Sequence, residues 1–219
     1  MDDLKMSILE DARIYVEDLF SNEGSGHDHY HMMRVASTAS LIARREGADL
    51  FIVELSALLH DVDDVKLFPE TAGECLHARA FMRKWNLEDG TIERVIHIIK
   101  QVSFKGTDSE VPDSIEGKCV QDADRLDAIG AIGIARAFSY GGNHGRAMYD
   151  PDVPPMLDMD EKTYRNRKSH TLNHFYEKLF LLKDMMNTGT GRCLAEKRHE
   201  FMENFVNEFL EEWNGVSEM

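Results

Sequence analysis

The chain has 219 residues, of which 42% are hydrophobic and 30% charged, a composition that can fill a core and excludes a disordered protein. Its 40 acidic and 25 basic residues give a formal charge of −15, which disfavours nucleic-acid polymers and anionic membranes as partners. A small anionic substrate remains compatible with this charge if the few cations gather at one place. The three cysteines, Cys75, Cys119 and Cys193, show no Cys-x-x-Cys spacing, as is usual in a reducing compartment.

The length suits one domain and is short for two full ones. No stretch approaches about 20 uninterrupted apolar residues, so we expect no membrane span. The first five residues lack the basic start and apolar core of a signal peptide. We therefore expect a soluble, cytoplasmic protein.

Apolar residues recur every three or four positions along most of the chain, which predicts an all-α fold of about seven to nine helices. The first two helices follow the apolar positions from Leu4 to Leu19 and from Met32 to Ala43, with a loop over 21–26 between them. Six more helices are expected, at residues 49–60, 70–85, 88–102, 115–139, 161–187 and 191–213.

Segment 140–160 contains three of the five prolines and is too long for a plain connection, which predicts a lid or an irregular wall. It begins with Tyr140-Gly141-Gly142-Asn143-His144-Gly145-Arg146. Glycines there would let backbone amides approach a phosphate, so a substrate contact is one interpretation of this stretch and a flexible turn is the other.

Three segments place titratable side chains on otherwise apolar helices. Burying an imidazole or a carboxylate is costly unless it is compensated, and neighbouring carboxylates repel each other unless a cation or protons intervene. One bound metal would compensate all three segments together, whereas polar helix ends that face water are the alternative for each segment alone. The residues concerned are His27, Asp28 and His31, then His60 and Asp61, then Asp122, Asp124 and Asp127.

The order of these residues resembles a known family. His60-Asp61 follows His31 after 29 positions, and Asp124 comes after another 63, which resembles the H…HD…D signature of the HD-domain superfamily of metal-dependent phosphohydrolases. The sequence motifs around these residues resemble those of a bacterial branch labelled YedJ/YpgQ-like, and the resemblance covers roughly residues 20–213. These motifs are Gly26-His27-Asp28-x-x-His31-x-x-Arg34-Val35, Ala57-Leu58-Leu59-His60-Asp61 and Asp122-Ala123-Asp124-Arg125-Leu126-Asp127-Ala128-Ile129-Gly130.

The resemblance implies a single HD domain over 1–219, with a metal-site core at about 20–140 and a C-terminal helical extension at about 160–213. It also implies that one divalent metal is held by four ligands, of which the last precedes a short Leu-Asp-Ala run. Two imidazoles and two carboxylates suit Mn²⁺ or Mg²⁺ best, with Fe²⁺, Co²⁺ or Zn²⁺ as alternatives. The implied ligands are His31, His60, Asp61 and Asp124.

The chain departs from the family at one short sequence motif. Related sequences often have Asn-His-Ser-Phe where this chain has Gln101-Val102-Ser103-Phe104, so a second metal or a catalytic histidine from that helix is in doubt. His97 and His77 are the substitutes we consider. For His97 a role as a satisfied core histidine is an equal alternative.

The family's activity implies hydrolysis of a phosphate ester or anhydride by metal-activated water, with cations around the other phosphates. Lys66 is the first candidate for both catalysis and substrate binding. Asp64 would orient or deprotonate the water, and His27 would hold His31 in one tautomer. Further candidate substrate contacts are Arg34, Arg125, Arg136 and Arg146, for which ordinary salt bridges are the alternative.

The preferred function is pyrophosphate release from nucleoside or deoxynucleoside triphosphates, by analogy with the family. A phosphodiesterase or phosphatase acting on a cyclic or signalling nucleotide is one alternative, and a non-catalytic HD-fold module that binds nucleotides or proteins is another. The expected partner is therefore a small phosphorylated substrate, with no nucleic-acid polymer and no membrane, and a homodimer is left open.

His170 and His174 are four residues apart, a spacing that can bind a metal on a helix. With no third ligand nearby in the sequence, a solvated helix face is the favoured interpretation of this pair.

Overall fold

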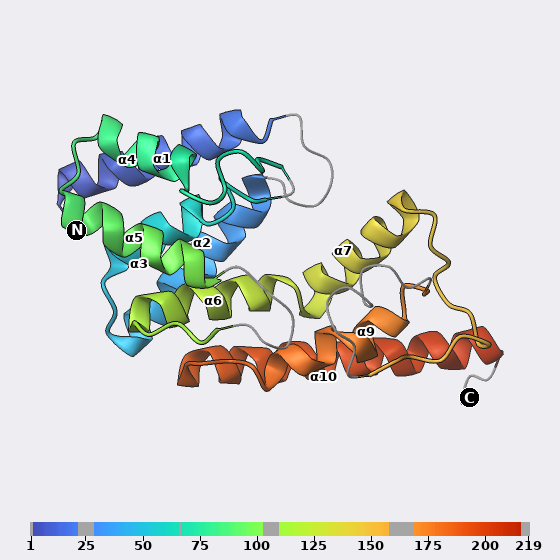
Figure 1. Cartoon of the computed structure of the whole chain (residues 1–219). Coiled ribbons are helices and arrows are strands. Elements are labelled where there is room, and N and C mark those ends of the chain that lie inside the picture. Colours follow the sequence, from blue (N-terminus) through green and yellow to red (C-terminus); the bar gives the residue numbers. More distant parts are fainter. Residues whose placement is uncertain (1, 22–28, 66, 103–109, 158–168, 216–219) are drawn as a thin grey trace. The chain divides into compact units, whose positions relative to one another are not determined.

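The computed structural model describes residues 2–21, 29–65, 67–102, 110–157 and 169–215. These residues contain nine α-helices, one 3₁₀ helix and no strand, which confirms the all-α prediction (Figure 1). No helix within these ranges is long and apolar enough to cross a membrane. The elements are α1 (Asp3–Leu19), α2 (His29–Glu46), α3 (Leu50–Leu59), α4 (Leu76–Lys84), α5 (Asp89–Val102), α6 (Ile115–Asp127), α7 (Gly130–Asn143), α9 (Asn173–Glu177), η2 (Leu179–Lys183) and α10 (Gly189–Asn214).

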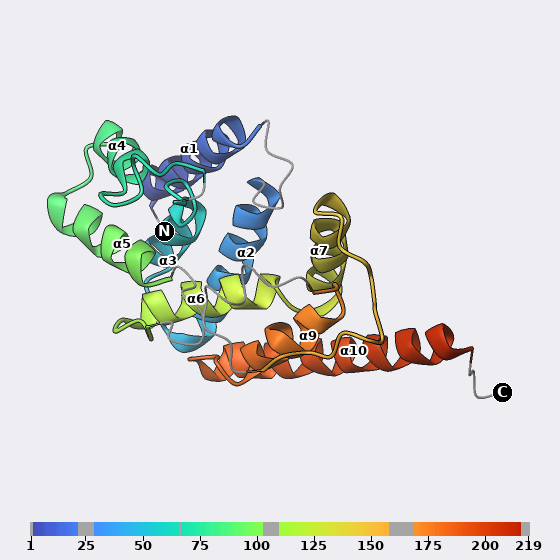
Figure 2. The same cartoon turned by 45° about the vertical axis from the view of Figure 1, so that its right-hand side comes forward.

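The chain forms two compact units, Met1–Asp124 and Arg125–Met219. In the first, α3 packs against α1, α2 and α5 (Figure 2). Eight of the ten residues of α3 are buried, because apolar side chains occupy nearly every position of this short helix. The carboxylate of Asp49 starts α3 by accepting the backbone N–H groups of Phe51 and Ile52. This packing holds the end of α3 at a fixed place in the unit.

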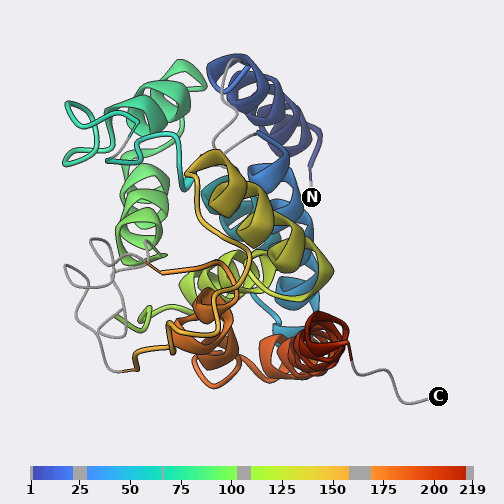
Figure 3. The same cartoon turned by 90° about the vertical axis from the view of Figure 1, so that its right-hand side faces the viewer.

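The second unit is built on α10, which packs against α7 and η2 (Figure 3). Thr188 caps the start of α10, and Gly215 ends it in the left-handed conformation with φ of +67°. An aromatic cluster fills the interior, with ring centroids of Phe138, Phe175 and Phe205 5.9 to 6.1 Å apart. These three rings join α7, α9 and α10 within the unit.

The helix expected at 115–139 is two helices, so that prediction was wrong. Ile129 is extended, and Gly130 has φ of +76°, a conformation that favours glycine. The chain then turns so tightly that a Cβ on Gly133 would lie 2.2 Å from the Ala128 carbonyl oxygen. Apolar periodicity continues through this break, which is why the sequence pattern did not reveal it.

The helix expected at 70–85 begins later, at Leu76. The segment before it consists of turns, and Cys75 has φ of 51° directly before the helix. The carboxylate of Asp63 accepts the N–H groups of His77 and Ala78 at 3.1 and 3.0 Å. The start of α4 is therefore set by the side chain of Asp63, which lies 14 residues before His77 in the sequence.

Two expectations for the C-terminal half also change. Irregular structure was expected over 140–160, but Tyr140 to Asn143 belong to α7. Within the described part of that segment, residues 144–157 are irregular. The continuous helix expected at 161–187 is, over 169–187, the short helix α9 followed by η2, interrupted at Lys178 with φ of −145°. The helices expected at 88–102 and 191–213 match α5 and α10 to within a few residues.

Candidate metal centre

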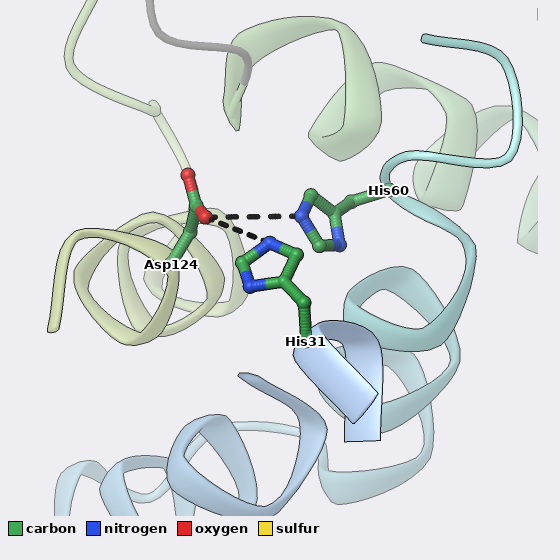
Figure 4. A group of neighbouring side chains, drawn as sticks. All are labelled: His31, His60 and Asp124. Carbon is green, nitrogen blue, oxygen red and sulfur yellow. Dashed lines mark ion pairs between the residues drawn. The ribbon is translucent and has the colours of Figure 1, made fainter. Parts of the chain in front are cut away.

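Four of the singled-out side chains meet inside the N-terminal unit, and each comes from the end or one face of a helix. His31 lies in the first turn of α2, and Asp124 lies near the end of α6. His60 is the residue at which α3 ends, and Asp61 follows it. Figure 4 shows His31, His60 and Asp124 pointing toward one another from these three elements. Residues far apart in the sequence thus converge on one point.

The distances within this group are short enough for one ion to touch all its members. The Nε2 atom of His31 lies 3.3 Å from Oδ1 of Asp124 and 3.6 Å from Oδ2 of Asp61. The Nε2 atom of His60 lies 3.5 Å from Oδ1 of Asp61 and 3.8 Å from Oδ1 of Asp124. One ligand atom from each of His31, His60 and Asp124 lies within 4.8 Å of the other two.

The hydrogen bonding of His60 decides which of its ring nitrogens faces the group. Nδ1 lies 2.8 Å from the carbonyl oxygen of Ala57, which can only accept, so Nδ1 carries the proton. Nε2 then presents a lone pair, is buried, and has no hydrogen-bond partner among the residues the structure describes. A buried imidazole lone pair without a donor is costly unless a cation takes its place.

The carboxylate of Asp124 is kept in its charged form. Burial raises the pKa of this group, but the neighbouring imidazoles of His31 and His60, when they carry a proton, lower it by more, even with Asp61 opposing them. The net pKa of Asp124 is lower than usual. A second carboxylate, Asp61, faces the same two imidazoles, and two carboxylates placed so close together favour a cation between them.

The residues present fit a divalent metal ion. Two imidazole nitrogens and two carboxylates match the donors used by first-row divalent ions, and the unpartnered Nε2 of His60 is aimed at the common centre. His31, His60, Asp61 and Asp124 would hold the ion.

Asp63 has a role that the sequence did not reveal. The sequence showed it only as one of several carboxylates after the His60-Asp61 pair. In the structure it is buried and accepts the two N–H groups at the start of α4, while Nδ1 of His77 donates to the Val62 carbonyl at 2.9 Å. These three bonds anchor the backbone just after the metal-binding pair to α4.

The other residues expected near the metal are placed as follows. Asp64 is half-buried in the turn after Asp61, where its N–H donates to the Asp61 carbonyl at 3.0 Å. Arg34 is half-buried on α2, three residues after His31. His27 and Lys66 lie outside the described residues.

The remaining arginines expected to bind substrate belong to the C-terminal unit. Arg125 is buried and donates to the Met185 carbonyl. Arg136 pairs with Asp127 at 2.6 Å, the ordinary salt bridge that was the alternative for it. Arg146 lies over the ring of Tyr140.

Four further histidines have defined surroundings in the structure. His97 is an exposed side chain rather than a core residue, 2.8 Å from Oδ2 of Asp113. His77 helps to anchor α4, as described above. The solvated face expected for His170 and His174 is wrong. His170 is buried and donates from Nε2 to the Val153 carbonyl, and burial together with Lys178 and Arg146 lowers the pKa of His174 to about 3.

Comparison with known proteins adds a family to this geometry. The model of the HD domain family matches residues 29–129, a range that contains all four candidate ligands. The uncharacterised protein YpgQ of Bacillus subtilis is 44% identical over 222 residues, which cover 99% of this chain and 98% of that protein.

Solved structures agree over nearly the whole length. The crystal structure of an HD-superfamily hydrolase from Bacillus thuringiensis has a TM-score of 0.78 and 42% identity, covering 96% of this chain and 98% of that one. The crystal structure of Bacillus subtilis YpgQ in complex with ADP has a TM-score of 0.72 and 43% identity, covering 93% and 96%.

Proposed function

Because this chain belongs to the HD-domain superfamily, in a branch shared with YpgQ and with HD-superfamily hydrolases, we propose that it is a metal-dependent phosphohydrolase that cleaves nucleoside and deoxynucleoside triphosphates with release of pyrophosphate. The observation that carries the proposal is that two imidazoles and two carboxylates face one another around a common point. The Nε2 atom of His60 faces this point without a hydrogen-bond partner among the residues described. The ADP complex of YpgQ supports a nucleotide as the substrate class.

A divalent ion held by such ligands lowers the pKa of a bound water and polarises a phosphoryl oxygen. We assign Mn²⁺ or Mg²⁺ to the site, because a set that includes two carboxylates leaves room for hard cations. The residues of the chain do the rest. His31 and His60 keep their Nε2 atoms toward the centre, and Asp61 and Asp124 direct carboxylate oxygens toward it.

Asp64 is our candidate for taking the proton of the attacking water. It follows the ligand Asp61 by three positions in a turn whose backbone bonds fix its place: its carbonyl accepts the N–H groups of Leu67 and Phe68 at 3.1 and 2.7 Å. Lys66 and His27 retain the roles that the sequence suggests, in phosphate binding and in orienting His31. An Asp64→Asn variant would keep the metal and lose the base.

A nucleotide panel with product identification tests this function. The purified protein is incubated with Mn²⁺ and each of the ribo- and deoxyribonucleoside triphosphates, and the products are separated by ion-exchange chromatography. We expect equal amounts of nucleoside monophosphate and pyrophosphate, with no turnover by Asp124→Asn. The control is Asp113→Asn, which removes an exposed carboxylate of the same unit that pairs with His97.

Other outcomes of the panel separate the alternatives. Release of inorganic phosphate alone would indicate a phosphatase. Turnover of cyclic nucleotides without turnover of triphosphates would indicate a phosphodiesterase. Metal retention with no turnover of any phosphate compound would indicate a binding module, and both the pyrophosphohydrolase and the hydrolase proposal would then be wrong.

A further inference from the structure

The end of α7 carries an exposed group of aromatic and cationic side chains, formed by Tyr140, His144 and Arg146. The Tyr140 side chain is 46% exposed. The His144 ring stacks on it with centroids 3.9 Å apart and planes 23° apart, and the guanidinium carbon of Arg146 lies 5.5 Å from the Tyr140 centroid. Sequence analysis left this stretch open between a substrate contact and a flexible turn.

Backbone hydrogen bonds hold this group in place. The N–H of Arg146 donates to the Gly141 carbonyl at 2.8 Å, and Nδ1 of His144 donates to the Tyr140 carbonyl at 2.9 Å. The Nε2 atom of His144 therefore points away from its own helix. The three side chains form a defined surface rather than a flexible turn.

Arg146 stands out among the arginines of its unit. Arg136 pairs with the Asp127 carboxylate, and Arg198 donates to the Leu126 carbonyl. The guanidinium of Arg146, in contrast, is half-buried and lies over the Tyr140 ring, with no carboxylate paired to it among the described residues. In a chain with 15 more acidic than basic residues, a partly desolvated guanidinium placed on an aromatic ring is a candidate anion site.

The charge of Arg146 also acts on His174. Burial is the main cause that lowers the pKa of His174 to about 3, and the charges of Lys178 and Arg146 contribute to the same effect.

The surface also has room beside it. A Cβ built on Gly142 or on Gly145 would meet no atom within 4 Å. Gly145 has φ of +64°, so the turn that carries Arg146 favours glycine. The backbone beside the group is therefore open at these two glycines.

We propose that Tyr140, His144 and Arg146 form a nucleotide-binding site, in which Arg146 holds a phosphate and the two rings stack with the base. The proposal takes its ligand class from the proposed function. A guanidinium provides paired N–H donors that match phosphate oxygens, and aromatic rings stack with any base.

The test is a binding titration of the full chain by calorimetry in EDTA, so that neither metal binding nor hydrolysis contributes. ADP and inorganic pyrophosphate are the probes. Arg146→Gln is expected to weaken both about tenfold, and Tyr140→Leu to weaken ADP about tenfold while leaving pyrophosphate unchanged. The control is Lys197→Gln, which removes one exposed positive charge from the same unit. Tyr140→Phe keeps the ring and should bind ADP as the wild type does.

Equal affinities of Arg146→Gln and wild type for ADP would overturn the proposal, as would an absence of ADP binding by the wild type. A thermal melt identifies a misfolded variant, in which case His144→Ala, expected to weaken ADP but not to unfold α7, replaces it. Hydrolysis of triphosphates by the wild type, together with equal ADP affinities of wild type and Arg146→Gln, would leave the enzyme function intact and this site wrong. If the protein hydrolysed no nucleotide but bound ADP in a way that depends on Arg146, the binding site would be confirmed and the proposed enzyme function would be wrong.

Discussion

Two buried histidines, one in each unit, show how differently the same side chain can be used. His170 in the C-terminal unit has both ring nitrogens satisfied, since Nε2 donates to the Val153 carbonyl at 3.0 Å and Nδ1 accepts the Asn173 N–H at 3.2 Å. His60 in the N-terminal unit has only Nδ1 satisfied, and its Nε2 faces two carboxylates. A buried imidazole that has one unpaired ring nitrogen facing carboxylates is suited to bind a cation. A buried imidazole with hydrogen bonds to both ring nitrogens has a structural role.

The largest expected effect separates the two histidines by metal content. His60→Gln and Asp61→Ala should each lose the bound divalent ion, because each removes a ligand and leaves the others too few. Nucleotide turnover should fall about a thousandfold, equivalent to about 4 kcal/mol of transition-state stabilisation. His170→Gln should keep the metal and the turnover. Elemental analysis of the dialysed proteins checks this, and a full metal content in His60→Gln would remove the site.

The second effect concerns the anchor beside the metal ligands. Asp63→Ala leaves two buried N–H groups at the start of α4 without their acceptor, which should lower the free energy of unfolding by about 2 to 3 kcal/mol. The loosened backbone should also weaken Mn²⁺ binding about tenfold. Urea unfolding and a Mn²⁺ titration of the folded protein measure the two losses.

Asp63→Asn is the matched variant for this anchor. It keeps the shape and one acceptor oxygen, so it should lose about half as much stability as Asp63→Ala. If Asp63→Ala were as stable as the wild type, the bonds to α4 would not hold this segment.

The contrast also shows what the sequence reveals and what it conceals. The resemblance to the HD-domain signature predicted that His31, His60-Asp61 and Asp124 meet, because the order and the spacing of these residues match that signature. The bonds of Asp63 to α4 and of His170 to Val153 are tertiary, and no local pattern announces them. The break before Gly130 was hidden for another reason, since apolar periodicity continues on both sides of it while the backbone reverses into a left-handed turn.

A third, smaller effect tests whether His170 is structural. His170→Leu removes both hydrogen bonds and leaves the Val153 carbonyl with only the Asn173 side chain as donor, at 2.8 Å. The free energy of unfolding should fall by about 1 to 2 kcal/mol with metal content unchanged. Chemical unfolding of the metal-free protein measures it. A loss of metal in this variant would contradict the division of roles between the two histidines.

The smallest expected effect is on the pH dependence of stability and comes from His174, a histidine whose environment differs from those of His60 and His170. Its pKa is lowered from 6.5 to about 3, so above pH 6.5 the ring is neutral in both the folded and the unfolded chain and contributes no pH dependence. As the pH falls below 6.5, the imidazole of His174 binds a proton in the unfolded chain but not in the folded chain. The free energy of unfolding therefore falls until the pH approaches 3. Between pH 7 and pH 5.5 the loss from this residue should be about 1 kcal/mol. His174→Gln should therefore show a flatter stability profile over that interval, measured by urea unfolding at each pH, with His97→Gln as the exposed control. An identical slope in wild type and His174→Gln would mean that the ring already takes up its proton in the folded chain, and that burial, with the charges of Lys178 and Arg146, does not lower its pKa.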